Sequence, residues 1–159
     1  MSFTDPILHY FYIMIIIAHN IRSLHNVGAI FRNAAAFNIE KLYLTGITAT
    51  PPRKEIAKVA LGAQDLVQWE QGEVQQVIHQ LQLDGYNVLG LETGDDAVDI
   101  KTIQEENIAL VLGNEVEGID AETLELLDGK VVIPMGKKRS LNVSVASGIA
   151  MYQLANLSA

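Results

Sequence analysis

The stretch PMGKKRSLNVSVASG, from Pro134 to Gly148, joins the pattern of a buried strand to that of a helix. The run KVVIPM (Lys130–Met135) is short, apolar and β-branched, as a buried strand is. The run NVSVASGIAMYQLANL (Asn142–Leu157) is predicted to be a helix, with Asn142 or Ser140 as its cap. A polar turn between a strand and a helix is where α/β proteins usually build binding sites. A capped helix with solvated lysines explains this turn equally well.

Outward from this stretch, strand patterns alternate with helical patterns along the chain. The predicted strands are residues 10–18, 41–46, 66–69, 86–92, 108–113 and 130–135, and the predicted helices are residues 27–37, 56–61, 73–85, a short one after 120 and 142–157. This alternation predicts an α/β fold with a mostly parallel sheet covered by helices on both faces. Since ligands of such folds bind at the carboxyl ends of strands, functional residues are expected just after strands.

The composition favours one globular domain over residues 1–159. Of the 159 residues, 49% are hydrophobic, which is too many for a disordered chain and enough for a substantial core. The chain has no cysteine, so disulfides and thiolate metal sites are excluded. The four histidines show no metal-ligand spacing, so we expect no metal.

The N-terminal run ILHYFYIMIIIA (Ile7–Ala18) is strongly apolar. Its length of 12 residues is short of the ~20 residues that span a bilayer. No basic region precedes it and no small-residue cleavage site follows it, so a buried strand is a better interpretation than a signal peptide. We therefore expect no membrane segment and a cytoplasmic location.

The net charge of −8 conceals a strong asymmetry along the chain. From Asp65 to Asp128 there are 16 acidic residues and one base, whereas the rest of the chain has 3 acidic residues and 10 bases. One part of the molecule is thus cationic although the average is acidic. This distribution permits nucleic-acid binding; a solvated surface is the alternative.

The sequence LVLGNEVEGID (Leu110–Asp120) follows a predicted strand with residues suited to a binding loop. Gly113 and Gly118 allow a close approach of the backbone, and Asn114 and Glu115 place an amide and a carboxylate at the strand end. The alternative is an ordinary loop in which Asp120 caps the next helix. The sequence contains no GxGxxG, GxxxxGK[ST] or GxSxG motif, so dinucleotide, P-loop and α/β-hydrolase functions lack their signatures.

The sequence RSLHNVGAIFRNAAAF (Arg22–Phe37) contains a second candidate site. Arg32 interrupts the apolar side of the predicted helix, where a guanidinium is costly unless it is paired or points into a site. Asn26 is expected in the preceding turn, and the two side chains could converge. The alternative is an arginine whose charged end reaches solvent along the flank of the helix.

Three stretches in this order resemble the motifs of the SpoU (TrmH-like) branch of the SPOUT RNA methyltransferases. They are NVGAIFR (Asn26–Arg32), LVLGNEVEG (Leu110–Gly118) and IPMGKKRSLNVSVA (Ile133–Ala146). The connections YLTGITATPP and KVALGA are also similar to members of that family, so the resemblance covers nearly the whole chain. Two positions depart from the family pattern: Asn38 stands where glycine is common, and Arg139 where an acidic residue is frequent.

The resemblance implies S-adenosylmethionine as methyl donor and a ribose 2′-hydroxyl of tRNA or rRNA as acceptor. It further implies a C-terminal trefoil knot and a homodimer whose active sites are shared between subunits. Family members often carry an additional N-terminal RNA-binding domain, for which we expect no room in this chain. A non-catalytic homologue that binds RNA or a nucleotide with the same fold is the alternative function.

The family's roles can be transferred residue by residue. By this resemblance the cofactor-binding residues are Leu91, Gly113, Ile133 and Leu141, and the catalytic residues at the polar rim are Asn26, Arg32, Glu115, Ser140 and Asn142. The presence of all five rim residues favours an enzyme, because a binding module does not need the whole set.

Overall fold

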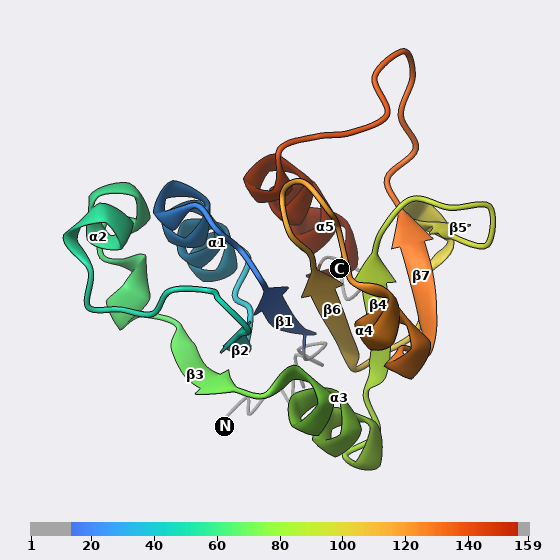
Figure 1. Ribbon diagram of the computed structural model, residues 1–159, viewed down its shortest axis with the longest axis horizontal. Coiled ribbons are helices and arrows are strands. Elements are labelled where there is room, and N and C mark those ends of the chain that lie inside the picture. Colours follow the sequence, from blue (N-terminus) through green and yellow to red (C-terminus); the bar gives the residue numbers. More distant parts are fainter. Residues whose placement is uncertain (1–13, 156–159) are drawn as a thin grey trace, which may run out of the picture.

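The computed structural model describes residues 14–155, which form a sheet of seven parallel strands in the order β3-β2-β1-β6-β4-β7-β5. The strands are β1 Met14–His19, β2 Lys41–Thr45, β3 Gln68–Gly72, β4 Asn87–Leu91, β5 Val98–Asp99, β6 Ile108–Leu112 and β7 Gly129–Val132. The helices are α1 Leu24–Ala36, α2 Lys54–Ala60, α3 Val74–Leu83, α4 Ala121–Leu126 and α5 Val143–Ala155, with the 3-10 turns η1 Ala63–Asp65 and η2 Ile100–Thr102 (Figure 1).

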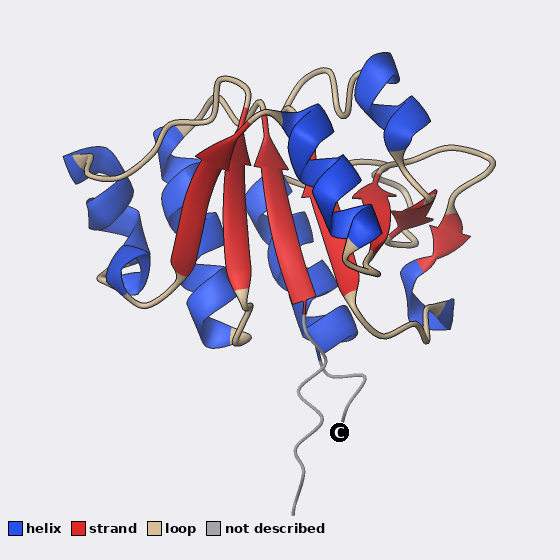
Figure 2. Cartoon of the chain, turned by 90° about the horizontal axis from the view of Figure 1, so that it is seen from below, coloured by secondary structure: helices blue, strands red, loops and turns tan. Residues whose placement is uncertain are grey.

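Helices cover both faces of the sheet, as the sequence predicts (Figure 2). The reason is visible in β1, whose six residues are all buried. Alternate side chains of a strand point to opposite faces, so Ile16 joins a core with α1, α2 and α5, whereas Ile15 and Ile17 join a core with α3 and α4. The predicted α/β class is therefore confirmed.

Helix α1 begins at Leu24 rather than at the predicted Val27. The Ser23 side chain accepts a hydrogen bond of 3.2 Å from the backbone N–H of Asn26 and so caps the helix three residues earlier. Asn26 consequently lies in the first turn of α1 and not in the preceding loop. The expectation that placed it in a turn is wrong.

Two strands differ from the prediction in their ends, and one strand was not predicted. Strand β3 runs from Gln68 to Gly72 instead of residues 66–69, and β7 ends at Val132 instead of Met135. As an edge strand paired only to β2, β3 is mostly exposed and lacks the apolar pattern used to find it. The two-residue strand β5 is too short to give any pattern. Residues 10–13 and 156–157 of two predicted elements lie outside the described residues.

The strand order brings the carboxyl ends of β6, β4 and β7 side by side, between the middle of the sheet and the edge strand β5. After β7 the chain leaves the body of the molecule in an extended loop and returns to α5 (Figure 1). Between residues 14 and 155, no helix is long and apolar enough to cross a bilayer. The trefoil knot implied by the resemblance stays a prediction.

Candidate functional site

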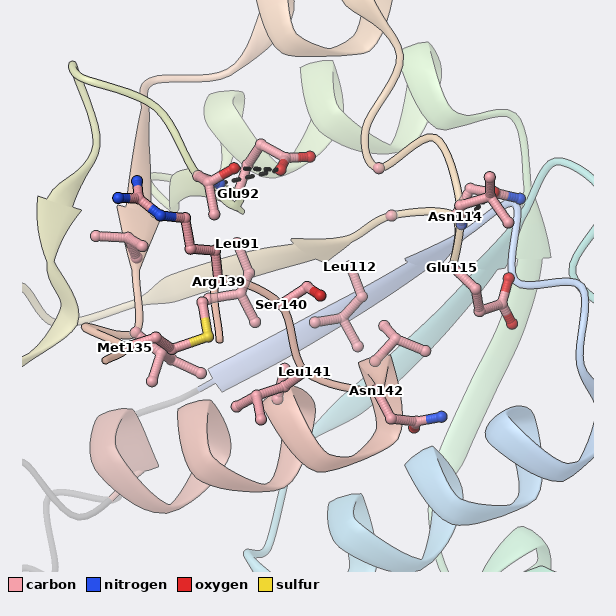
Figure 3. A pocket seen from close by; sticks show the side chains of 18 residues that line it. Leu91, Glu92, Leu112, Asn114, Glu115, Met135, Arg139, Ser140, Leu141 and Asn142 are labelled. Atoms are coloured by element: carbon pink, nitrogen blue, oxygen red, sulfur yellow. Dashed lines mark hydrogen bonds between the residues drawn. The ribbon is translucent and has the colours of Figure 1, made fainter. Parts of the chain in front are cut away.

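A cavity of about 450 Å³ opens at the carboxyl ends of β4, β6 and β7 (Figure 3). This volume is typical of sites for small molecules. The lining residues come from the strand ends, the two loops that follow β6 and β7, and the first turn of α5: Leu91, Glu92, Thr93, Leu112, Gly113, Asn114, Glu115, Val116, Gly118, Val132, Ile133, Met135, Arg139, Ser140, Leu141, Asn142, Val143 and Ala146. The cavity thus has apolar walls at the strand ends and polar groups at its rim.

The loop of residues 113–120, here called the β6 loop, forms one wall of the cavity. The two ends of the loop pack backbone against backbone. A Cβ atom added to Gly113 would lie 2.5 Å from the Gly118 carbonyl carbon and 2.5 Å from the Ile119 nitrogen, so no side chain fits there. Gly118 itself has a φ of +71°. Both glycines are therefore required by geometry, which is the role expected of them from the sequence.

Glu115 anchors the β6 loop to the beginning of α1. One of its carboxylate oxygens accepts from the backbone N–H of Arg22 at 3.0 Å, and the other accepts from the Ser23 N–H and the Asn26 side-chain amide, each at 3.0 Å. Burial raises the pKa of the Glu115 carboxyl, but these three donors outweigh burial and hold the pKa below its ordinary value. Glu115 is thus an ionised carboxylate with both oxygens engaged.

Asn114 forms a second anchor of the same loop. Its side-chain amide donates to the Asn20 carbonyl at 2.9 Å, and its Oδ1 accepts from the backbone N–H groups of Val116 and Glu117. The backbones of Asn114 and Gly118 also exchange two hydrogen bonds of 3.0 Å. The loop tip is therefore closed on itself and attached to the end of β1.

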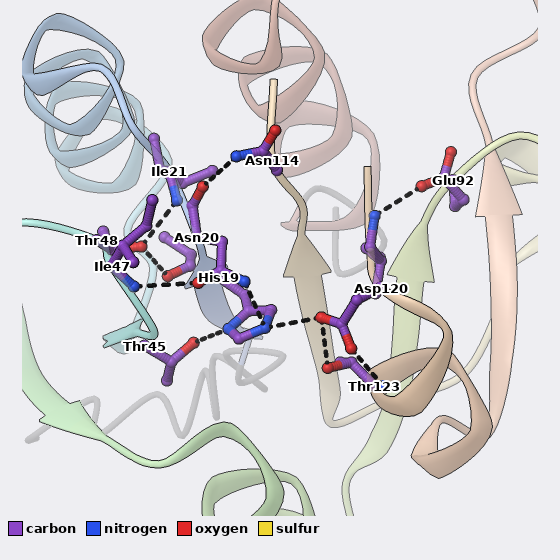
Figure 4. Close-up of polar contacts among 12 residues, drawn as sticks. His19, Asn20, Ile21, Thr45, Ile47, Thr48, Glu92, Asn114, Asp120 and Thr123 are labelled. Atoms are coloured by element: carbon purple, nitrogen blue, oxygen red, sulfur yellow. Dashed lines mark hydrogen bonds and ion pairs between the residues drawn. The ribbon is translucent and has the colours of Figure 1, made fainter. Parts of the chain in front are cut away.

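The third anchor is a buried histidine that the sequence analysis did not identify as important. His19 lies between Thr45 and Asp120, its Nδ1 2.9 Å from the Thr45 hydroxyl and its Nε2 3.0 Å from an Asp120 carboxylate oxygen (Figure 4). Asp120 also accepts from the backbone N–H of Thr123 at 2.9 Å, which confirms it as the cap of α4. Burial raises the pKa of Asp120, but its bonds to Thr123 and His19 hold the pKa below its ordinary value.

The loop of residues 134–142, here called the β7 loop, forms the opposite wall and is exposed from Gly136 to Asn142. Within the described part of the chain, residues 136–141 form no hydrogen bond to one another or to other residues. Asn142 ends the loop, because its Oδ1 accepts from the Ser144 N–H at 2.9 Å. Of the two predicted caps of α5, Asn142 is therefore confirmed.

Seven of the nine predicted site residues line the cavity. They are Leu91, Gly113, Glu115, Ile133, Ser140, Leu141 and Asn142. Asn26 is buried and reaches the cavity through its bond to Glu115. Arg32 is exposed on α1 and does not line the cavity of its own chain.

Asn26 and Arg32 do not converge within one chain, contrary to the expectation from their spacing. Six residues along an α-helix turn a side chain by about 240°, which places Arg32 on a different side of α1 from Asn26. Among residues 14–155, Arg32 also has no acidic partner within salt-bridge distance. Its guanidinium is therefore available to a group outside residues 14–155.

Glu92 is a lining residue that the sequence analysis missed. Its Oε2 accepts from the Ile119 N–H at 3.0 Å and its Oε1 from the Thr93 N–H at 3.0 Å, so it ties the β6 loop to the end of β4. Its position at the carboxyl end of the predicted strand of residues 86–92 was the available signal. Within residues 14–155, no group of three or more His, Asp or Glu side chains could hold a metal ion.

Comparison with known proteins gives a consistent result. The family model described as "SpoU rRNA Methylase family" matches residues 13–152. The tRNA (guanosine(18)-2'-O)-methyltransferase of Aquifex aeolicus is 32% identical over 145 residues, which covers 88% of this chain and 67% of the relative. The 23S rRNA (guanosine-2'-O-)-methyltransferase RlmB of Xanthomonas axonopodis pv. citri is 30% identical over 142 residues, covering 88% of this chain and 57% of the relative.

The fold is also similar to that of a solved structure. The AdoMet-bound rRNA methyltransferase from Sinorhizobium meliloti superposes with a TM-score of 0.82 at 24% sequence identity, covering 89% of this chain and 55% of the other. The chain spans between about half and two thirds of the length of these three proteins.

Proposed function

Since the chain belongs to the SpoU rRNA methylase family, we propose that it is an S-adenosylmethionine-dependent methyltransferase that modifies a ribose 2′-hydroxyl of RNA. The observation that carries this proposal is the cavity at the ends of β4, β6 and β7, which gathers seven of the nine residues expected from the family motifs. The proposal treats residues 14–155 as one catalytic domain.

The cavity fits S-adenosylmethionine in size and chemistry. Its volume of about 450 Å³ suits a molecule of that size. Leu91, Ile133 and Leu141 supply apolar walls for an adenosyl group, and Gly113 contributes backbone at the end of β6. A neutral adenine is recognised by such backbone groups and apolar surfaces rather than by charges.

When bound, the cofactor supplies an electrophilic methyl group, and the protein has to position the ribose hydroxyl in line with it. Ser140 and Asn142 stand exposed at the cavity rim and are suited to hold the ribose. Glu115 is poorly suited to accept the hydroxyl proton, because both its oxygens already accept hydrogen bonds and its pKa is lowered. We therefore assign Glu115 and Asn26 the task of fixing the β6 loop.

Arg32 is assigned to the substrate. A guanidinium keeps its charge in proteins, so it can hold a phosphate or stabilise a developing alkoxide but cannot serve as a base. Because Arg32 is exposed and outside the cavity of its own chain, this role requires the cavity of a second copy. The active unit is accordingly a homodimer with shared sites.

Helix α5 offers the surface for such a dimer. Val145, Ile149 and Tyr152 follow one another at helical spacing and are 50%, 41% and 60% exposed. The ring of Tyr152 packs edge-on against Phe37, so this apolar surface continues to the end of α1. An isologous contact through this surface would cover both helices at once.

Mixing two inactive variants tests the shared site. If Arg32 of one chain serves the cavity of the other, a dimer of Arg32→Ala with Ser140→Ala has one site with both lesions and one with neither. Methyl transfer by the mixture should then rise to a substantial fraction of the wild-type rate. A mixture that stays as inactive as its components would show that each chain is self-sufficient.

The acceptor is a tRNA or an rRNA, and we place the reaction in the cytoplasm, where both are available. Purified protein should transfer labelled methyl groups from S-adenosylmethionine to total tRNA or rRNA, and nuclease mapping should locate the label on a ribose. Binding of RNA and cofactor without transfer would favour the non-catalytic alternative. Label on a base instead of a ribose would contradict the proposed reaction.

A further inference from the structure

Exposed cations lie on both sides of the cavity along one edge of the sheet. Because all strands are parallel, residues that follow strands lie at the carboxyl edge, where the cavity opens. Arg22 follows β1, and Arg53 and Lys54 follow β2; these three exposed residues are called the β2 flank. The β7 flank consists of the exposed residues Lys137, Lys138 and Arg139, which follow β7.

The strand order places the two flanks on opposite sides of the cavity. From β2 to β7 the sheet runs β2-β1-β6-β4-β7, and strands are about 4.8 Å apart, so about 19 Å separate the outer strands of this set. The ends of β6 and β4, which line the cavity, lie between them. Arg22 directly adjoins the cavity, since its backbone N–H binds the lining residue Glu115 at 3.0 Å.

The opposite edge of the sheet carries the opposite charge. The segments just before β2, β4, β6 and β7 contain acidic residues and no base: Glu40, Asp84, Glu105, Glu106 and Asp128. A polyanion is therefore repelled from the amino edge and attracted to the carboxyl edge, although the net charge of the whole chain is −8.

The carboxyl edge also carries acidic groups. Glu92, Glu115 and Asp120 accept hydrogen bonds from backbone N–H groups, and Asp96 is paired with Lys130. Glu73, Asp95, Glu117 and Glu122 are further exposed acids that follow strands, and none of them belongs to either flank. On the β2 flank, Arg53 lies 3.8 Å from Glu55, and both side chains are about half exposed, so this pair holds the guanidinium weakly.

We propose that an RNA strand lies along the carboxyl edge, with its phosphates contacted by the β2 flank on one side of the cavity and by the β7 flank on the other. Phosphate contacts fix the register of a nucleic acid on a protein without reading its sequence. Contacts on both sides would hold one ribose over the cavity between them. This inference rests on the proposed function, since it takes RNA as the polyanion.

Three pairs of substitutions with the same change in charge test the proposal. They are Arg53→Gln with Lys54→Gln on the β2 flank, Lys137→Gln with Lys138→Gln on the β7 flank, and Lys58→Gln with Lys101→Gln as the control. Lys58 lies in the last turn of α2 and Lys101 on η2, so the control removes two exposed cations from neither flank. All six positions are exposed, so folding is expected to be unaffected.

The measurement is the fluorescence anisotropy of end-labelled bulk tRNA, titrated with each protein at several salt concentrations. Each lost phosphate contact lowers the slope of log affinity against log salt by roughly 0.7 to 0.9. Each flank pair should therefore lower the slope by roughly 1.5, whereas the control pair should leave it unchanged. The proposal requires a lower slope for both flanks and not for the control. A slope that changes for one flank alone, or changes equally for the control, would overturn it.

Calorimetry with S-adenosylhomocysteine separates this inference from the proposed function. Variants of both flanks should bind this ligand as the wild type does, because their substituted side chains are not among the lining residues. If the salt slope falls for both flank pairs but no methyl transfer occurs, the proposed RNA contacts are supported and the proposed reaction fails. If methyl transfer occurs but the wild-type protein shows no salt-dependent RNA binding, the proposed phosphate contacts fail and the proposed reaction is supported.

Discussion

The β6 loop and the β7 loop enclose the same cavity but are built in opposite ways. The β6 loop is attached to β1, β4 and α1 through the side chains of Asn114, Glu92 and Glu115, and its last residue is bound by His19. The β7 loop is exposed from Gly136 to Asn142, and between residues 136 and 141 it forms no hydrogen bond within the described chain. One wall of the cavity is thus fixed before any ligand binds.

This difference suggests how the two walls divide their work. A fixed wall keeps the end of β6 in place for the cofactor without a cost in ordering at the moment of binding. The β7 loop carries Ser140, Leu141 and the cations of the β7 flank. Because residues 136–141 are not held by hydrogen bonds within the described chain, these groups can adjust their positions when cofactor and RNA bind. We therefore expect substitutions in the β6 loop to affect stability and those at residues 136–141 of the β7 loop to affect activity alone.

The largest effect is expected when an alanine replaces a glycine in the fixed wall. In Gly113→Ala, the new Cβ would lie 2.5 Å from the backbone at Gly118 and Ile119, so the loop must move. The free energy of unfolding should fall by roughly 3 kcal/mol, and binding of S-adenosylhomocysteine should be lost. Gly136→Ala, in the β7 loop, is the matched control, since nothing lies within 4 Å of an added Cβ. The free energy of unfolding of this variant should differ from that of the wild type by less than about 0.5 kcal/mol. Equal effects at both positions, measured by denaturant unfolding, would remove the distinction between the walls.

The next effect concerns the charge of Glu115. In Glu115→Gln the carboxylate is replaced by an amide whose N–H₂ group faces backbone donors, so the free energy of unfolding at pH 7 should fall by about 2 kcal/mol. The folded pKa of Glu115 is lowered, so its contribution is present above the ordinary value and is lost as pH falls through the folded value. The stability curves of wild type and variant should therefore converge below pH ~4. A gap that stays constant down to pH 2 would contradict this account of the anchor.

A smaller effect is expected from His19, and it separates the contact of the ring with Thr45 from its contact with Asp120. His19→Gln can keep a donor near Asp120, whereas His19→Asn can keep a partner for Thr45. If the bond to Asp120 holds the β6 loop, His19→Gln should retain cofactor affinity, and His19→Asn should weaken it and cost about 1 kcal/mol of stability. Calorimetry and thermal unfolding of the two variants check this. The reverse order would show that the contact with Thr45 is the important one.

The smallest effect on stability is expected for Ser140 in the β7 loop. Ser140 is exposed and forms no hydrogen bond in the described chain, so Ser140→Ala should change the free energy of unfolding by less than about 0.5 kcal/mol. Methyl transfer should nevertheless fall by roughly a hundredfold, as for the loss of one well-placed polar group in an active site. An active variant would remove Ser140 from the site.

Leu91, Gly113 and Ser140, which were assigned from the family resemblance, line one cavity because of how parallel sheets are built. The carboxyl ends of all strands lie at one edge, and the strand order places those of β4, β6 and β7 next to one another. The anchor between His19 and Asp120 could not be predicted in this way. It depends on β1 lying beside β6, which no local pattern encodes.

The misplaced elements have local causes. Helix α1 starts at Leu24 because a Ser23 side chain caps it, a local signal that the predicted start at Val27 did not use. That shift moved Asn26 onto the helix and separated it from Arg32. The role of Arg32 is still a proposal, because it depends on a second chain.

Hydrogen exchange with and without S-adenosylhomocysteine tests most directly whether the cavity between these loops is the cofactor site. In the free protein, the backbone N–H groups of Val116, Glu117 and Ile119 should exchange slowly, because each donates to a side chain. Those of residues 136–141 should exchange rapidly. On addition of the ligand, residues 136–141 should become strongly protected while the β6 loop changes little. Protection that appears only away from both loops, or an unchanged β7 loop at saturating ligand, would contradict the account.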